Sequence, residues 1–292
     1  MIRAAILSLF PQGIRRELRT RRAIWRAERE LHASRWAADS SRAHSLPGKL
    51  FISLTSYPPR FRTLHLTLES LLQQTTAADG ILLWIAHSDV AALPNKVRSL
   101  QNRGVRIIPC EDIRSYKKLV PALEAYPDAF IATADDDLRY SPDWLEMLVD
   151  GYDPSNPCLV CHRAHRVRIT SDGHIAPYLE WERDVQDARA RMPSADLIGT
   201  TGAGVLFFPG CLPSKALDRR LFLELCPDAD DLWFFWMARL GAVRHRKVGP
   251  KFRLATWPES QSIRLFNTNK MGGNDHQVAA LRQAFGQPDL AA

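Results

Sequence analysis

Three consecutive carboxylates, Asp135, Asp136 and Asp137, come directly after an apolar run at residues 129–134. Turn-forming residues lie on both sides of this stretch, which is typical of a short buried strand in the middle of a parallel sheet. The acids then lie at the carboxyl end of that strand, the edge where open α/β sheets bind ligands. Because side chains alternate along a strand, we expect Asp135 and Asp137 to face one way and Asp136 the other.

The chemistry that this cluster favours is the binding of a divalent cation. Like charges about 4 Å apart repel by roughly 4 kcal/mol at an effective dielectric constant of 20, so the cluster needs compensation. Hard oxygen ligands suit Mn2+ or Mg2+, which bind one or two carboxylates together with substrate phosphates. The alternative is that the acids only cap the next helix, but Ser141 at the N-cap and Pro142 at the first helical position already suit that purpose.

A second acidic pair, Asp230 and Asp231, precedes an aromatic segment at residues 232–235. Carboxylates at the start of a helix are commonly caps that stabilise it by about 1 kcal/mol. Beside an apolar helix, however, two adjacent acids raise the pKa of one of them, and a carboxylate with a raised pKa can act as a general base. The residues alone leave both interpretations open.

The elements that must position these acids alternate between strands and helices. Apolar runs predict strands at residues 49–55, 81–86, 105–109 and 129–134, and helical periodicity predicts helices at 61–74, 95–102 and 117–126. This alternation predicts an α/β protein with a mostly parallel, Rossmann-like sheet and right-handed crossovers. No glycine-rich dinucleotide fingerprint follows the first strand, which argues against a nicotinamide or flavin enzyme.

The second half of the chain contains shorter signals. A strand is expected at residues 157–160, and Asp172-Gly173 predicts a hairpin between 168–170 and 174–176. Glycines at 199, 202 and 204 precede another apolar strand at 205–209, where they allow a tight turn or a close backbone approach to a sugar. A last helix is expected to begin near Asn274, a plausible N-cap, and to run to about residue 285.

Three of these segments together carry a resemblance to a known family. They are Thr55-Ser56-Tyr57-Pro58-Pro59-Arg60 after the first strand, Ser115-Tyr116-Lys117-Lys118-Leu119 before a helix, and Thr133-Ala134-Asp135-Asp136-Asp137. Over residues 49–286 the chain resembles bacterial glycosyltransferases of the GT-A fold, in the family-2-like group. That family holds a divalent metal on the diphosphate of a nucleotide sugar with an Asp-x-Asp motif.

The resemblance implies a role for each matching residue. It implies metal binding by Asp135, Asp137 and His276, and donor binding by Thr55, Tyr57, Arg60, Lys118, Asp135, Asp136, Gly202 and Gly204. The family's x-Glu-Asp motif corresponds to Ala229-Asp230-Asp231, which implies that Asp231 is the base and Asp230 contacts the acceptor. Because Asp replaces Glu at position 230, the two roles could be exchanged.

The function that follows from the resemblance is an inverting sugar transfer dependent on Mn2+ or Mg2+. The expected donor is a nucleotide sugar, a UDP-sugar first, and the expected acceptor is a glycan or lipid-linked glycan in surface polysaccharide synthesis. Two alternatives remain: a metal-dependent nucleotidyltransferase of related topology, and a non-catalytic glycan-binding or scaffold protein. The absence of a glycine- and arginine-rich loop after the first strand argues against the nucleotidyltransferase.

The basic charge of the chain is concentrated in residues 1–46, which hold ten arginines against four acids, or +6 of the total of +7. The remainder, residues 47–292, is expected to be the transferase domain and carries only +1, so we expect no nucleic-acid partner. Apolar residues from Ile14 to Trp36 recur at near-helical spacing among the arginines. This pattern predicts a basic amphipathic helix that lies on an anionic membrane surface, or that packs on the domain or on a partner.

Two further features bear on location. The apolar run at residues 2–10 ends at Pro11, which is too short to span a membrane and lacks a secretory cleavage pattern. The five cysteines are odd in number and without framework spacing, as in proteins of reducing compartments. We therefore expect a cytoplasmic protein that is peripheral on the inner face of the membrane.

Overall fold

The computed structural model describes residues 12–34, 41–258, 260 and 273–290. Its central feature is a seven-stranded sheet with the order β11-β7-β10-β6-β2-β4-β5. The four strands β6, β2, β4 and β5 run parallel to one another, whereas β10 lies antiparallel between β6 and β7. The expected α/β architecture, a mostly parallel sheet flanked by helices with a helical N-terminal segment, is confirmed.

The described elements follow one another in this way. The strands are β1 (Arg42–Ala43), β2 (Leu50–Thr55), β3 (Thr76–Ala77), β4 (Gly80–Ala86), β5 (Val105–Cys110), β6 (Phe130–Thr133), β7 (Leu159–Cys161), β8 (Ala164–Arg166), β9 (Leu197–Gly199), β10 (Val205–Phe207) and β11 (His245–Lys247). The α-helices are α2 (Gln12–Ser34), α3 (Phe61–Leu71), α4 (Asn95–Arg98), α5 (Val120–Ala125), α6 (Trp144–Asp150), α7 (Arg219–Leu225), α8 (Asp230–Leu240) and α10 (Asn274–Phe285).

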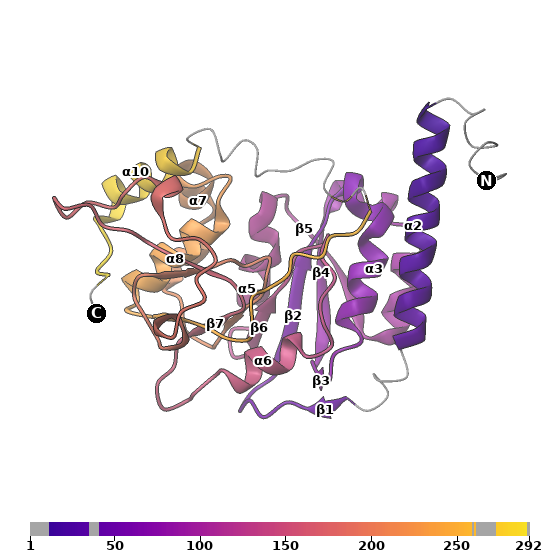
Figure 1. The fold of residues 1–292 in the computed structure, drawn as a ribbon, viewed down its shortest axis with the longest axis horizontal. Coiled ribbons are helices and arrows are strands. Elements are labelled where there is room, and N and C mark those ends of the chain that lie inside the picture. The colour runs from indigo at the N-terminus through magenta and orange to yellow at the C-terminus, as the bar shows by residue number, and fades with distance from the viewer. Residues whose placement is uncertain (1–11, 35–40, 259, 261–272, 291–292) are drawn as a thin grey trace.

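The two faces of the sheet bury separate cores because successive side chains of a strand point in opposite directions. On one face, Phe51 and Ile131 join a core with residues of α5, α7, α8 and α10. On the other face, Ile52 and Ala132 join a core with residues of α3, α4 and α6. Figure 1 shows α7, α8 and α10 gathered at one end of the molecule and α2 beside α3 at the other.

The N-terminal helix α2 packs on the domain along part of its surface. Ala27 and Leu31 are buried against Leu66 of α3 and against Trp257, with Ile24 at the edge of this small cluster. Trp36, the last apolar residue of the expected helix, lies outside the described residues, and so does the apolar run at residues 2–10. No helix in the described ranges is long and apolar enough to cross a membrane.

Two helix starts differ from the sequence expectation. Helix α6 begins at Trp144 rather than at Pro142, its N-cap is Asp143 without a side-chain cap bond, and Ser141 contributes only its carbonyl, which accepts from the Trp144 amide at 3.1 Å. Helix α10 has Gly273 at its N-cap, so Asn274 is its first residue and not its cap.

The hairpin expected at Asp172-Gly173 is present. The Thr170 amide donates to the His174 carbonyl at 2.8 Å, and Gly173 adopts a φ of +83° that favours glycine. All five cysteines are thiols, and four of them, Cys158, Cys161, Cys211 and Cys226, are buried.

Candidate active site

The three aspartates lie in a turn just beyond the end of β6, the central strand of the sheet. Because the strand ends at Thr133, the alternation of its side chains does not extend to the aspartates. The expectation that Asp135 and Asp137 point in the same direction is not met, since the two carboxylates have different basic partners. Asp136 and Asp137 each lie 2.7 Å from the Arg60 guanidinium, whereas Asp135 accepts from the Lys118 ammonium at 2.7 Å. We refer to residues 135–137 as the acidic loop.

Arg60 and Lys118 therefore provide the charge compensation that the sequence argument assigned to a metal. Asp136 also accepts from the Ser56 hydroxyl at 2.6 Å, and burial raises its pKa although Arg60 opposes the rise. Burial likewise opposes ionisation of Asp135, but Lys118 outweighs it and lowers the pKa of that carboxyl. Because these basic side chains already compensate the aspartates, the repulsion between the carboxylates is no longer an argument for a bound metal ion.

The backbone of the acidic loop is held by polar side chains from distant parts of the chain. The Thr67 hydroxyl on α3 donates to the carbonyls of Asp136 and Leu138, at 2.9 and 3.0 Å. The Trp257 amide donates to the Asp137 carbonyl at 3.2 Å, and its indole donates to Thr67. These bonds fix the direction of the loop without engaging its carboxylates.

Lys118 connects the acidic loop to the second acidic pair. Its side chain is buried, and the ammonium lies 2.7 Å from Asp135 and 3.3 Å from Asp230 at the start of α8. Burial disfavours the charged form of Lys118, but the surrounding carboxylates, Asp135 foremost, outweigh it and raise the pKa. The ammonium is therefore charged at physiological pH.

Asp231 is held beside Lys118 by the glycine-rich segment. The amide and hydroxyl of Thr201 donate to one oxygen of the Asp231 carboxylate, at 2.8 and 2.6 Å. Burial raises the pKa of Asp231 to about 6, and the neighbouring Asp230 charge adds to the rise, whereas Lys118 opposes it. A carboxylate with this pKa is ionised at neutral pH and still basic enough to accept a proton.

The glycine-rich segment lies directly against the acidic loop. A Cβ on Gly202 would lie 2.0 Å from an Asp135 carboxylate oxygen, and Gly204, at a φ of +117°, would place one 2.5 Å from the Trp144 indole. The Tyr140 hydroxyl accepts from the Asp135 amide and donates to the Gly202 carbonyl, at 2.7 and 2.6 Å. Close packing thus requires both glycines, and their contact with a donor sugar stays a prediction.

The remaining predicted site residues are less closely grouped. Thr55 ends β2 and donates to the Trp84 carbonyl at 2.8 Å, and the Tyr57 ring lies 5.8 Å from the Arg60 guanidinium carbon. His276 is exposed in the first turn of α10. Among the described residues, no three His, Cys, Asp or Glu side chains are gathered to hold a metal, so Asp135, Asp137 and His276 do not form such a set here.

A cation could still use part of this site, because a magnesium-like ion needs only one or two carboxylates besides phosphate oxygens. Asp135 is the most accessible of the three acids, with 38% of its side chain exposed against 7% for Asp137. Both carboxylates are paired with basic side chains, so an ion must compete with Lys118 and Arg60. Metal binding by Asp135 and Asp137 stays a prediction.

Sequence reasoning missed several residues that shape the site. Thr201 positions Asp231, Tyr140 joins the acidic loop to the glycine-rich segment, and Ser56 holds Asp136. Ser56 lies within a motif that the sequence did single out. Thr201 and Tyr140 act on partners 30 and 62 residues away, and no local pattern announces such a contact.

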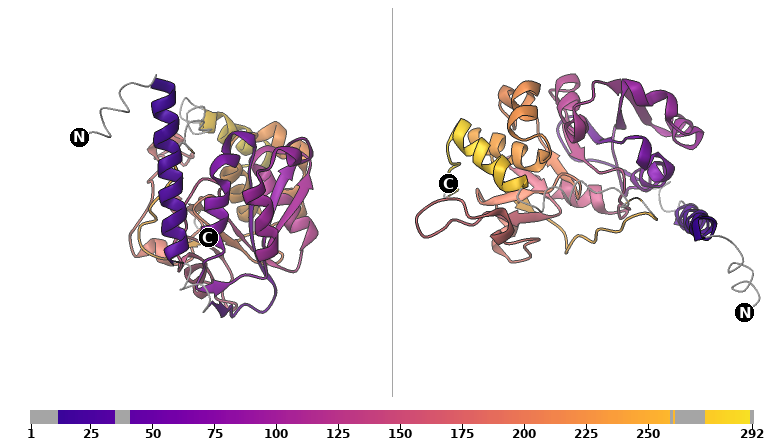
Figure 2. Two further views of the ribbon diagram at one scale, coloured as in Figure 1. Left: turned by 90° about the vertical axis from the view of Figure 1, so that its right-hand side faces the viewer. Right: turned by 90° about the horizontal axis from the view of Figure 1, so that it is seen from above.

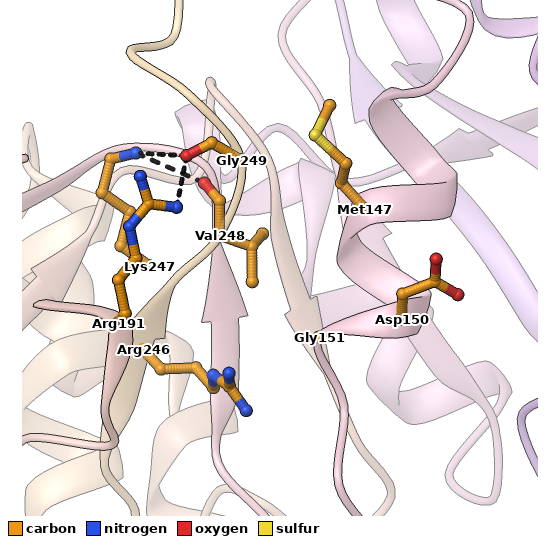
Figure 3. Close-up of a pocket in the computed structure, with 8 residues that line it drawn as sticks. All are labelled: Met147, Asp150, Gly151, Arg191, Arg246, Lys247, Val248 and Gly249. Atoms are coloured by element: carbon orange, nitrogen blue, oxygen red, sulfur yellow. Dashed lines mark hydrogen bonds between the residues drawn. The ribbon is translucent and has the colours of Figure 1, made fainter. Parts of the chain in front are cut away.

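A separate hollow of about 280 Å3 lies away from this site and contains none of the predicted site residues (Figure 3). It is lined by Met147, Asp150, Gly151, Arg191, Arg246, Lys247, Val248 and Gly249. The Lys247 ammonium donates to the carbonyls of Val248, Gly249 and Pro250, and Arg191 also donates to Gly249. Two basic side chains of this hollow, Lys247 and Arg191, thus donate hydrogen bonds to backbone carbonyls.

Comparison with known proteins gives distant structural similarity only. No protein-family model matches the chain, and no curated protein sequence matches it. Solved structures do match, among them 4-diphosphocytidyl-2C-methyl-D-erythritol synthase from Anaerococcus prevotii, at 13% identity and a TM-score of 0.45 over 81% of this chain and 98% of that one.

Two further solved structures have similar scores. Glucosyl-3-phosphoglycerate synthase from Mycobacterium tuberculosis, solved with Mn2+, UDP and phosphoglyceric acid, has 13% identity and a TM-score of 0.43 over 89% of this chain and 84% of that one. TarS residues 1–349 from S. aureus has 12% identity and a TM-score of 0.42 over 81% and 72%. Similarity this distant assigns no activity to the present chain.

Proposed function

We propose that the protein is a glycosyltransferase that moves a sugar from a nucleotide-sugar donor to a hydroxyl of a glycan or lipid-linked glycan, with inversion. The acidic loop and its basic partners bind the donor diphosphate, and Asp231 accepts the acceptor's proton. The bond between the anomeric carbon and the phosphate oxygen breaks, and its electron pair leaves with the nucleoside diphosphate. The acceptor oxygen bonds to the anomeric carbon from the opposite side.

The observation that carries this proposal is the position of the Lys118 ammonium, between Asp135 on the acidic loop and Asp230 at the start of α8. This position supports the proposal because it brings a cation that could bind phosphate close to a candidate base, at the carboxyl edge of β6. Preorganised charge at a leaving diphosphate is commonly the largest single contribution to such a reaction. Lys118 and Arg60 supply that charge from the protein itself.

A divalent cation, Mn2+ or Mg2+, would be held by Asp135 and Asp137 together with the diphosphate, and would supply further neutralisation of the leaving group. Lys118 and Arg60 would then turn from the carboxylates to phosphate oxygens. The donor proposed first is a UDP-sugar. A membrane-peripheral location in the cytoplasm fits a lipid-linked acceptor.

The test is to incubate the protein with Mn2+ and a panel of nucleotide sugars, and in parallel with nucleoside triphosphates and sugar phosphates. We expect release of a nucleoside diphosphate from at least one donor. Release of pyrophosphate from a triphosphate would instead identify a nucleotidyltransferase. Failure of every substrate would favour a non-catalytic glycan-binding protein.

The variant Asp231→Asn tests the proposed base. We expect it to bind donor normally and to lower the rate of sugar transfer by about 10²- to 10⁴-fold. In the wild type, the rate should decline as the pH falls below about 6, because the base is then protonated. Asp228→Asn is the matched control, since Asp228 is paired with Arg114 at 2.6 Å just before α8. Equal loss in both variants would move the base elsewhere.

A further inference from the structure

Helix α2 has two apolar faces rather than the one expected from its sequence. At 3.6 residues per turn, Ile24, Ala27 and Leu31 lie within about 60° of one another around the helix, and they form the face that packs on Leu66 and Trp257. Ile14, Leu18 and Trp25 lie within about 40° of one another on a different face. None of these three residues belongs to the cluster that packs on the domain.

The second face is exposed. The exposed fractions are 47% for Ile14, 41% for Leu18 and 52% for Trp25. Among the described residues, eight large hydrophobic side chains are this exposed, and three of them lie on this one helix. Figure 2 shows α2 at the margin of the molecule, seen along its length in one view and end-on in the other. Contiguous exposed apolar residues of this kind mark interaction surfaces.

The charged residues of α2 are also unevenly distributed around the helix. All three acids of the helix form ion pairs with the body of the protein, Glu17 with Arg62, Glu28 with Lys96, and Glu30 with Arg139. Glu28 is also hydrogen-bonded to His65 at 2.8 Å. Glu17 also pairs with Arg21 of the same helix at 2.7 Å, whereas Glu28 and Glu30 neutralise basic groups of the domain. These acids do not neutralise Arg19, Arg22 and Arg26 on the outer face.

The arginines surround the exposed apolar residues. Arg19, Arg22 and Arg26 are exposed, and none of them has an ion pair with a described residue. The Arg29 guanidinium carbon lies 4.8 Å from the centre of the Trp25 ring. An apolar centre with a tryptophan, bordered by arginines, is the arrangement of a helix that lies in the interface of an anionic bilayer.

We propose that the outer face of α2, formed by Ile14, Leu18 and Trp25 with Arg19, Arg22 and Arg26, docks on an anionic lipid bilayer. A second copy of the chain is a poorer occupant. A two-fold interface would place the same arginines opposite one another, and like charges would oppose association. The bilayer offers both an apolar interior and anionic headgroups. This inference does not depend on the proposed sugar transfer.

The test uses the full chain and sedimentation with vesicles of phosphatidylglycerol and phosphatidylcholine in equal parts, or of phosphatidylcholine alone. We expect binding to the anionic vesicles to be about tenfold tighter, and to weaken at about 0.5 M salt. The triple variant Ile14→Ser, Leu18→Ser, Trp25→Ser should lose about tenfold or more in affinity. Replacing Arg19, Arg22 and Arg26 by Gln should weaken binding to the anionic vesicles and reduce its salt dependence.

The matched control is the triple variant Leu179→Ser, Met192→Ser, Leu254→Ser, because these side chains are 59%, 64% and 52% exposed on other parts of the molecule. It should bind vesicles as the wild type does. Equal binding to neutral vesicles, or equal loss in both triple variants, would overturn the proposal. So would a change from dimer to monomer in the α2 variant without vesicle binding, or a lowered melting temperature of that variant, because the face would then be packed within the protein.

Discussion

At the scale of single residues, the site is organised by Lys118, a buried ammonium that faces two acidic groups. A buried charge is tolerated only when it is paired and hydrogen-bonded, and removing one partner leaves the other uncompensated. Lys118 also donates to the Thr201 hydroxyl at 3.2 Å, which itself holds Asp231. The lysine therefore couples the acidic loop to the proposed base.

This coupling leads to a prediction about metal binding. Because an incoming cation must compete with Lys118 for Asp135, we expect Mn2+ to bind weakly without nucleotide. Lys118→Met leaves that carboxylate without its ammonium, so titration calorimetry should show Mn2+ binding about tenfold or more tightly in this variant. Lys117→Met is the control, since the equally buried Lys117 pairs with Asp112 instead. Unchanged Mn2+ affinity in Lys118→Met would contradict metal binding at Asp135.

At the scale of elements, the regular half of the chain was predictable from its sequence and the site's contacts were not. The ends of strands β2, β4, β5 and β6 agree with the sequence prediction within about two residues, because an apolar run is a local signal. The placement of β6 at the centre of the sheet also followed from its apolar character. The pairing of Asp136 and Asp137 with one arginine did not, because it depends on where the strand ends.

The contact between the glycine-rich segment and the acidic loop is the second feature that sequence could not supply. Glycine at 202 suggested a close approach, and the structure identifies the approaching group as the Asp135 carboxylate. The partner of such a glycine is set by tertiary packing across 67 residues of chain. The sequence around a glycine can indicate that another group approaches its backbone closely, but it cannot identify that group.

Gly202→Ala tests this contact. Its Cβ would lie 2.0 Å from an Asp135 oxygen, so the carboxylate or the segment must shift. We expect a destabilisation of about 1–3 kcal/mol in denaturant unfolding and a fall of about 10²-fold in nucleoside diphosphate release. Gly241→Ala is the control, because its nearest contact would be 3.5 Å away, an ordinary distance. Activity retained by Gly202→Ala would separate the segment from the donor site.

At the scale of the whole molecule, α2 is attached to the acidic loop through few but continuous contacts. Leu31 packs with Trp257, whose amide and indole hold the Asp137 carbonyl and the Thr67 hydroxyl. Arg139, two residues after the loop, pairs with Glu30 at 3.0 Å. The N-terminal segment is therefore part of the support of the site, although its outer face is directed elsewhere.

Two equivalent substitutions on α2 should separate these two roles. Leu31→Ala removes a side chain that is 4% exposed, and we expect the free energy of unfolding to fall by about 2–3 kcal/mol. Leu18→Ala removes one that is 41% exposed, and should change stability by less than about 0.5 kcal/mol while weakening vesicle binding. Denaturant unfolding and vesicle sedimentation on both variants provide the comparison. Equal stability loss would mean that both faces are packed.

The burial of the native thiols has a practical consequence. Burial raises the pKa of Cys110 and Cys158 to about 11 and that of Cys161 and Cys211 to about 12, and it raises that of Cys226 as well. At pH 7 all five are protonated and react slowly with maleimides, since the thiolate is the nucleophile. A single cysteine introduced at Trp25 would then take up a spin label selectively, and its accessibility to oxygen and to nickel chelates would give its depth in a bilayer directly.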